Sequence, residues 1–224
     1  YDEAKKKEVY TKWRQVIRTH PLTGEQLPKL GTAGLISIMN ARNMLATRNY
    51  KFGQFKNYDA ISGETLAEKH LIKNRGCITC PIQCGRVVEV DGKQVKGPEL
   101  ETLGILGANI ENSDLNLILR WNYLLDLLGM DTISTGSTIA FAMELEEKGL
   151  WKNGLKFGDC QDLDKVLEKI ARREGIGNLL AEGSKRLSEK FGGKEFAIHS
   201  KGLELAAYEP RGAVGQGLGY ATAN

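Results

Sequence analysis

The stretch that decides the fold class is NSDLNLILRWNYLLDLLGMD, residues 112–131. Its first three residues, Asn, Ser and Asp, are types that cap helices, because a short polar side chain accepts hydrogen bonds from backbone N–H groups of the first turn. Leu, Ile, Trp and Tyr then follow up to Leu128, and Gly129 supplies the glycine at which many helices end. The sequence therefore predicts a helix over 115–128 that lies at the centre of the molecule.

Helical patterns flank this stretch on both sides. Residues 2–19 place apolar side chains at helical spacing, and Pro21 ends the pattern because the residue before a proline is disfavoured in the helical region. Further helices are expected over residues 31–44, 62–72, 134–149, 163–173 and 178–191, and another opens at 97–103. Valines alternate along residues 86–96 around Asp91-Gly92, which favours a two-residue hairpin turn. We therefore expect a mainly α fold, a multihelical domain with one small β-hairpin.

The composition is ordinary for a globular protein and excludes several classes of function. The 224 residues carry a net charge of +3, with 41% hydrophobic and 26% charged residues. This charge is too small and too evenly spread to indicate nucleic-acid binding, and no apolar run approaches the ~18 residues of a membrane helix. Four cysteines without a disulfide framework favour a reducing, cytoplasmic location. The chain starts at Tyr1 without Met and stops in a glycine-rich run at Asn224, so we expect a piece of a longer protein.

Three of the four cysteines lie in one short stretch, Gly76-Cys77-Ile78-Thr79-Cys80-Pro81-Ile82-Gln83-Cys84-Gly85, with the spacing C-x2-C-x3-C. Thiolates so close in sequence cannot all form disulfides of normal geometry, but together they can bind one soft metal centre. The run is typical of half of an iron–sulfur ligand set. A structural zinc site is the alternative, although the sequence has no second C-x2-C pair. Thiols without a metal are the remaining interpretation.

Four segments in this order resemble the tungsten-containing aldehyde:ferredoxin oxidoreductase family. They are the cysteine stretch 77–84, Gly97-Pro98-Glu99-Leu100-Glu101, Asp126-Leu127-Leu128-Gly129-Met130-Asp131, and Lys201-Gly202-Leu203-Glu204 with Tyr208-Glu209-Pro210-Arg211-Gly212. The resemblance implies the family's second, helical domain in residues 1–192 and the start of a third helical domain in residues 193–224. The family's N-terminal β domain and the remainder of its third domain would be missing domains of the same chain.

The resemblance also assigns the cysteines. It implies that Cys77, Cys80 and Cys84 are three thiolate ligands of a [4Fe–4S] cluster. The family's fourth ligand would lie beyond Asn224, so the cluster is expected to be labile or absent in this piece. Cys160 lies outside the family motifs and is interpreted as an ordinary thiol.

Asp126, Gly129 and Met130 resemble the family's D-x-x-G-L-D/C pterin motif, with Met in place of the usual Leu. A carboxylate has two acceptor oxygens in one plane and can pair with the amino–imino edge of a pterin. Glycine would let the ring approach the backbone, and methionine would keep an apolar contact. These residues are predicted to bind a tungsten (or molybdenum) bis-pterin shared with the missing domains. The alternative is a glycine-capped helix end with solvated aspartates.

Glu101 matches the glutamate that in the family lies beside the tungsten and the substrate pocket, and it is predicted to be catalytic. Protons must move as an aldehyde and water become an acid, and a partly desolvated carboxyl group with a raised pKa can carry them. Glu99 is the second candidate for this role. The alternative is a pair of glutamates that stabilise the start of a helix. The family's partner histidine would lie beyond Asn224, so no histidine here is assigned its role.

The favoured function is therefore a fragment of an oxidoreductase. The parent would oxidise a small aldehyde to a carboxylic acid at the tungsten-pterin centre and pass electrons through the cluster to ferredoxin, and the piece alone is expected to be inactive. Two alternatives remain open. One is a non-catalytic iron–sulfur electron-transfer module, and the other is a zinc-stabilised helical binding module. No nucleic-acid or membrane partner is expected.

Overall fold

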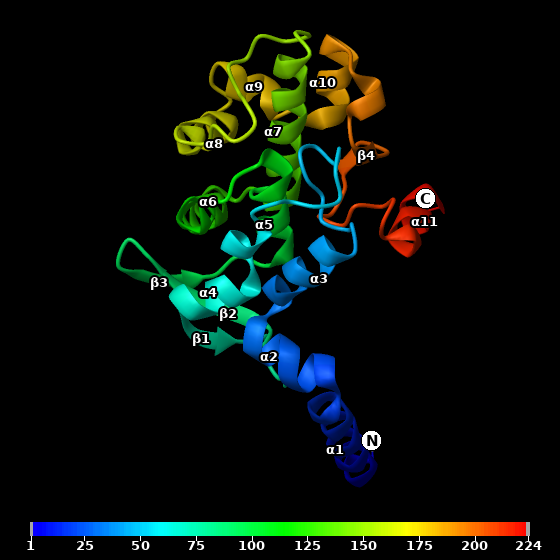
Figure 1. The fold of residues 1–224 in the computed structure, drawn as a ribbon. Coiled ribbons are helices and arrows are strands. Elements are labelled where there is room, and N and C mark those ends of the chain that lie inside the picture. Colours follow the sequence, from blue (N-terminus) through cyan, green and yellow to red (C-terminus); the bar gives the residue numbers. More distant parts are fainter. Residues whose placement is uncertain (1, 223–224) are drawn as a thin grey trace.

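Helices make up most of residues 2–222, the part of the chain that the computed structural model describes (Figure 1). The α-helices are α1 (Glu3–Thr19), α2 (Leu27–Leu30), α3 (Leu35–Ala41), α4 (Gly63–Lys69), α5 (Leu100–Ile105), α6 (Leu115–Leu128), α7 (Thr132–Glu147), α8 (Leu163–Arg172), α9 (Ile176–Leu180), α10 (Gly183–Phe191) and α11 (Val214–Thr222). Shorter turns of helix join them: η1 (Pro21–Gln26, a π-helix), η2 (Thr32–Gly34), η3 (Tyr58–Ile61), η4 (Ala108–Ile110) and η5 (Lys194–Phe196). The expected mainly α class is confirmed.

Two small antiparallel sheets accompany the helices. One has the order β1 (Leu71–Arg75), β2 (Gly85–Val90), β3 (Lys93–Lys96), and the other pairs β4 (His199–Ser200) with β5 (Leu203–Glu204). The expected hairpin is the β2–β3 pair, and Asp91 and Gly92 turn it with φ angles of 49° and 74°, as a two-residue turn between twisted strands requires. Strand β1 and the β4–β5 pair add to the one hairpin predicted. The helix predicted over 62–72 ends at Lys69 instead, because Leu71 already pairs with β2.

Helix α6 begins and ends where its sequence predicts. The Asp114 carboxylate accepts hydrogen bonds from the backbone N–H groups of Asn116 (2.9 Å) and Leu117 (3.3 Å). At the other end Gly129 adopts the left-handed conformation with a φ of 67°, and the next N–H donates back to the Leu125 carbonyl at 3.0 Å. One face of the helix is buried, through Leu115, Ile118, Leu119, Trp121, Asn122 and Leu125.

Helix α7, and not α6, occupies the centre of the molecule. Every residue from 136 to 145 is buried, and Figure 1 shows α7 running lengthwise through the fold, where it contacts α5, α9, α10 and β5. A Cβ at Gly136 would lie 2.5 Å from Ile105 Cγ2 and 2.9 Å from Leu106 Cδ2, so α5 packs here because the residue has no side chain. The prediction that the helix over 115–128 is central is therefore wrong, since the small residues of α7 allow burial on all sides.

The helix predicted over 178–191 is divided in two. Helix α9 ends at Leu180, and α10 begins at Gly183, whose φ of 81° interrupts the helical path. The Ser184 N–H and hydroxyl both donate to the buried Glu204 carboxylate, at 2.8 Å and 2.7 Å. These bonds fix the start of α10 to β5.

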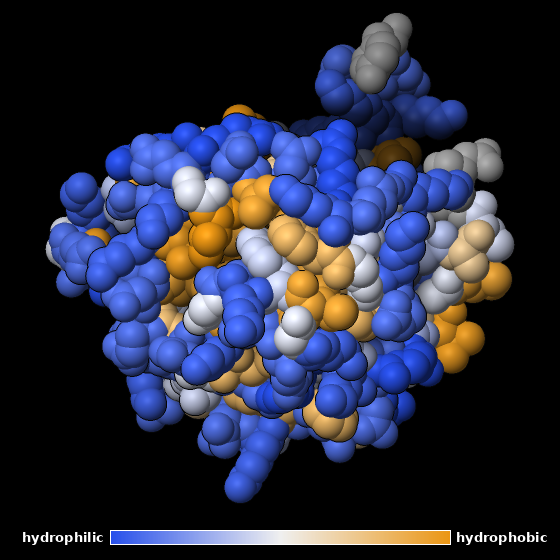
Figure 2. All heavy atoms as spheres, turned by 90° about the horizontal axis from the view of Figure 1, so that it is seen from above, coloured by the Kyte–Doolittle hydropathy of each residue, from blue (hydrophilic) through white to orange (hydrophobic). Residues whose placement is uncertain are grey.

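Some apolar surface remains uncovered, on helix α1 and on one end of the fold among other places. Helix α1 stands apart from the rest of the chain (Figure 1), none of its residues is buried, and Val9, Trp13 and Val16 of its predicted apolar face are exposed. Seen from the end where α9 and α10 lie, Figure 2 shows apolar surface in the middle of the face, within a hydrophilic rim. No helix within residues 2–222 combines the length and apolar character that crossing a membrane requires.

Two leucines of α6 test the assignment of its buried face. Leu125 is fully buried and Leu127 is 65% exposed, so Leu125→Ala should lower the free energy of unfolding by about 2–5 kcal/mol and Leu127→Ala by no more than about 0.5 kcal/mol. Denaturant unfolding of the two variants measures both values under the same conditions. Equal losses would contradict the orientation of α6.

Candidate functional site

The cysteine stretch forms the loop between β1 and β2. The Cys80 N–H donates to the Cys77 carbonyl at 3.1 Å, and left-handed residues at Thr79 (φ 67°) and Gln83 (φ 53°) fold the loop back on itself. Cys77 is exposed and the thiols of Cys80 and Cys84 are half-buried. All three are free thiols in the loop that joins β1 to β2.

The surroundings of Cys84 disfavour its negatively charged form. Burial raises the pKa of Cys84, Glu99 adds to this rise, and the negative charges of Cys80 and Cys77 add further to it. Within residues 2–222, however, no three Cys, His, Asp or Glu side chains converge on a single point where a metal ion could bind. The donors therefore have the chemistry of a soft-metal site, and the loop would have to tighten around a metal to use all three.

The segment 97–101 connects this loop to α5. The Gly97 N–H donates to the Arg86 carbonyl at 2.9 Å, which fixes the segment to β2 directly after the cysteines. The Glu99 carboxylate accepts a hydrogen bond from the Thr32 hydroxyl at 3.2 Å and lies 3.8 Å from Lys96 Nζ. Glu99 is the second candidate for proton transfer, and its carboxylate is already bonded to Thr32 and close to Lys96.

Glu101 lies in the first turn of α5 and is half-buried. Its Oε2 accepts a hydrogen bond from the Ala207 N–H at 2.6 Å. Burial raises the pKa of the Glu101 carboxyl, and Asp131 and Glu99 raise it further, while the Ala207 N–H acts in the opposite direction. Burial also raises the pKa of Tyr208, and the Glu101 charge contributes to that rise. These properties match the raised pKa that proton transfer requires.

The predicted pterin motif lies on the turn between α6 and α7. Asp126 is exposed, and no group within residues 2–222 donates a hydrogen bond to its carboxylate. Gly129 has open space on the side where a Cβ would stand, and Met130 packs against the core. Asp131 accepts from the Ser134 N–H at 2.7 Å and so caps α7. An unengaged carboxylate beside an open glycine is a suitable place for a planar ring with polar edges.

The first turn of α5 brings these parts together. The Gly97 N–H bond to the Arg86 carbonyl joins the segment before α5 to the strand that follows the cysteine loop. A hydrogen bond of 2.9 Å between the hydroxyls of Thr102 and Thr132 joins α5 to the start of α7. The individual motifs can be recognised in the sequence, but no sequence pattern indicates that they come together at α5.

The remaining family segment, 201–212, has structural roles that the sequence did not indicate. Its Glu204 carboxylate holds α10, as described above, and the buried Glu209 carboxylate accepts from Arg211 Nε at 2.8 Å and Nη2 at 2.7 Å. Ala207 and Tyr208 are the members of this segment that approach Glu101.

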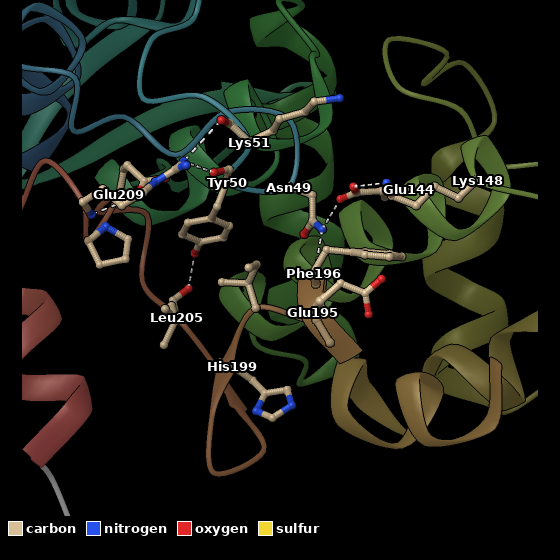
Figure 3. A pocket seen from close by; sticks show the side chains of 14 residues that line it. Asn49, Tyr50, Lys51, Glu144, Lys148, Glu195, Phe196, His199, Leu205 and Glu209 are labelled. Atoms are coloured by element: carbon tan, nitrogen blue, oxygen red, sulfur yellow. Dashed lines mark hydrogen bonds and ion pairs between the residues drawn. The ribbon is translucent and has the colours of Figure 1, made fainter. Parts of the chain in front are cut away.

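Figure 3 shows a cavity of about 490 Å³, and Glu101 is not among the residues that line it. The buried Tyr50 lines it, and the Tyr50 hydroxyl donates to the Ala206 carbonyl at 2.8 Å. Burial raises the pKa of Tyr50. Figure 3 also shows Asn49, which donates to Glu144 Oε2 at 2.7 Å, so the polar groups on this wall already have partners. We therefore place the candidate site at Glu101 and not in this cavity.

Cys160 and His20 have the ordinary roles that the sequence suggests. Cys160 is buried in the hydrophobic core, where burial raises its pKa to about 12. His20 ends α1, and its Nδ1 accepts a hydrogen bond from the Leu22 N–H at 3.2 Å. Neither side chain belongs to the candidate site.

Comparison with known families identifies the class of this protein. The family model described as aldehyde ferredoxin oxidoreductase, domains 2 & 3, matches residues 8–224, almost the whole chain. The chain belongs to this family.

Individual relatives agree with the family match. The tungsten-containing aldehyde ferredoxin oxidoreductase of Pyrococcus horikoshii is 45% identical over 233 aligned residues, which cover 100% of this chain and 38% of the relative. The enzyme of the same name from Pyrococcus furiosus is 45% identical over 93% of this chain and 36% of its own. The aliphatic sulfonate oxidoreductase, WOR-like subunit, of P. furiosus is 30% identical over 79% of this chain and 31% of its own. The chain thus spans between 31% and 38% of the length of these relatives.

A solved structure shows the same fold. The active-site complex BamBC of benzoyl coenzyme A reductase, in complex with 1,5-dienoyl-CoA, superposes with a TM-score of 0.67 over 88% of this chain and 32% of the other. The sequence identity is 22%, so the likeness concerns the fold alone.

The raised pKa of Glu101 predicts a pH-dependent effect of Glu101→Gln on stability. A carboxyl whose pKa is higher in the folded than in the unfolded state favours folding below its ordinary pKa, and this contribution is lost as the pH rises through the raised value. A glutamine side chain stays neutral throughout, so Glu101→Gln should raise the melting temperature at neutral pH and leave it unchanged in acid. Thermal unfolding over a pH series measures the difference. The exposed Glu89→Gln is the matched control, and the same pH dependence in both variants would contradict the burial of Glu101.

Proposed function

We propose that this chain forms the helical part of an oxidoreductase that converts aldehydes to carboxylic acids at a tungsten-pterin centre and passes electrons through a [4Fe–4S] cluster to ferredoxin. The proposal is supported by the hydrogen bonds around the start of α5, where Glu101 lies. The Gly97 N–H bond to the Arg86 carbonyl joins this segment to the strand after the cysteine loop, and the bond between the Thr102 and Thr132 hydroxyls joins it to the turn that carries the predicted pterin motif. The names of the relatives at 45% identity supply the metal, the substrate class and the electron acceptor.

The catalytic centre would be completed by further domains of the same chain. The relatives are more than twice as long as the aligned part, and the family match names two domains, which supports a helical domain in residues 1–192 and the start of the next in residues 193–224. All four cysteines are free thiols, and on that ground we propose a cytoplasmic location.

The overall reaction takes an aldehyde and water to a carboxylic acid, two protons and two electrons. When bound, the tungsten-pterin group (or its molybdenum counterpart) would supply the two-electron oxidation, and the iron–sulfur cluster would carry single electrons towards ferredoxin. The thiolates of Cys77, Cys80 and Cys84 would hold the cluster. The carboxylate of Asp126, with Gly129 and Met130, would hold the pterin. For the substrate we propose only that it is a small aldehyde.

Glu101 would handle the protons. Its Oε2 is occupied by the Ala207 N–H, so Oε1 is the atom left to exchange a proton with the reacting group or with water. A carboxyl group with a raised pKa takes up and returns a proton more readily near neutral pH than an ordinary glutamate does. The ordered backbone contact also fixes the orientation of the carboxyl plane, which proton transfer at a defined position needs.

An aliphatic sulfonate is the second candidate substrate class, because the relative named for sulfonate oxidation also covers most of this chain. Its identity of 30% is well below the 45% of the aldehyde enzymes. The identities therefore favour aldehydes, and turnover assays of the full-length enzyme with each class decide between them.

Cofactor analysis of the full-length protein tests the assigned binding residues. Cys84→Ser should lower the iron content strongly, because a hydroxyl is a poorer ligand for iron in such clusters than a thiolate. Asp126→Ala should leave iron in place and lower the content of tungsten and pterin. Iron, tungsten and pterin per chain are measured after anaerobic purification.

The buried Cys160→Ser and the exposed Asp162→Ala are the matched controls, and both should retain all cofactors. A wild-type protein that is colourless and binds one zinc ion would contradict the cluster. Unchanged pterin content in Asp126→Ala would contradict the pterin assignment.

Glu101→Gln tests the proton-transfer role. Gln keeps the acceptor for the Ala207 N–H but cannot carry a proton, so aldehyde turnover should fall by roughly 10²–10⁴-fold while the cofactors remain bound. Steady-state kinetics with parallel metal analysis measure both quantities. A variant that keeps its cofactors and full turnover would exclude Glu101 from proton transfer.

A further inference from the structure

Arg86 is a buried cation directly behind the cysteine loop. It lies in β2, two residues after Cys84, and only 2% of its surface is exposed. Its guanidinium donates to the Pro28 carbonyl at 3.0 Å, to the Leu27 carbonyl, to the Asn74 side-chain oxygen and, at 3.4 Å, to the Cys84 carbonyl. The side chain therefore ties the last cysteine of the loop to α2 and β1.

The charge of Arg86 has no anionic partner among these contacts. Its acceptors are three backbone carbonyls and one amide oxygen, all of them neutral, and its buried Nε has no hydrogen-bond partner within residues 2–222. Glu99 acts on it only at a distance, because that carboxylate contacts Thr32 and Lys96. An arginine stays charged in proteins, and a buried charge without a counter-charge costs several kcal/mol. A site of this kind is suited to a nearby anion.

Gly31 shows that the guanidinium and the cysteine loop fit closely. Gly31 has a φ of 66°, and a Cβ there would lie 2.7 Å from Arg86 Nε and 2.6 Å from the Cys84 carbonyl oxygen. The glycine therefore leaves room for Arg86 and the loop at the same time.

We propose that Arg86 is a positioning and counter-charge residue for the metal group held by Cys77, Cys80 and Cys84. This inference rests on the proposed function, in which that group is a cluster of thiolate-bound iron. A cluster bound by these thiolates would carry one more negative charge in its reduced form than in its oxidised form. A fixed positive charge in a water-poor setting stabilises the more negative form, so Arg86 raises the reduction potential of the cluster. Its bonds to the loop also help to retain the iron.

The test measures the reduction potential of the cluster in the full-length holoenzyme, by an EPR-monitored redox titration, together with iron retention against a chelator. Arg86→Gln should move the midpoint potential to more negative values and weaken iron retention roughly 10-fold or more. Arg86→Lys keeps the charge but loses the planar set of donors, so it should retain the wild-type potential and lose iron faster. The exposed Arg75→Gln, on the neighbouring strand β1, is the matched control and should change neither property.

Each result decides the proposal. A folded, iron-loaded Arg86→Gln with the wild-type potential would overturn it, and so would an Arg86→Lys potential shifted as far as that of Arg86→Gln. Where Arg86→Gln does not fold, Arg86→Lys decides alone: a wild-type potential supports the counter-charge role, and a more negative one overturns it. Failure of the proposed function looks different, because the wild-type protein itself would then show no cluster signal.

Discussion

The structure depends on the close approach of α5 to α7. Gly136 leaves no side chain between the two helices, so Ile105 and Leu106 rest directly on the backbone of α7. This contact fixes the axis of α5, and the hydrogen bond between the Thr102 and Thr132 hydroxyls fixes its start. The first turn of α5 is then held where the cysteine loop, the α6–α7 turn and the segment around Ala207 all reach it. A short helix of six residues thereby organises residues that are more than a hundred positions apart.

Negative charge is concentrated around that turn, and positive charge lies behind it. Glu99, Glu101 and Asp131 repel one another, which together with burial keeps the Glu101 carboxyl easier to protonate. Arg86 is the buried cation on the side of the cysteines. The two parts of the site thus differ in their electrostatics. The acidic surroundings of Glu101 favour its protonated form, and the positive charge of Arg86 would favour an added electron at the cysteine loop. This division agrees with the proposed reaction, which would release protons and electrons by different routes.

Local signals in the sequence predicted the fold class, the caps of α6 and the β2–β3 hairpin, because each depends on a few neighbouring residues. The prediction that α6 is the central helix was wrong. Periodicity shows which face of a helix is apolar, but it does not show how many other helices pack around it. Helix α7 looks more polar than α6, yet its Ser137 and Thr138 are buried. The cysteines, Glu101 and Asp126 were recognisable as motif residues, whereas Arg86 reads as a surface residue. Its burial follows from the room at Gly31, which no local pattern encodes.

The burial of Cys160 has a practical consequence for studying this chain. Burial in the core raises the pKa of Cys160 to about 12, so an alkylating reagent should modify the more accessible loop cysteines before Cys160. Among the loop cysteines, Cys84 should react most slowly, because burial raises its pKa as well. The number of labels added to the native protein, read by mass spectrometry, then counts the uncoordinated cysteines of the loop. The fourth cysteine appears only after unfolding and provides an internal standard. Labelling would therefore show, without any substitution, whether the proposed metal ligands are occupied.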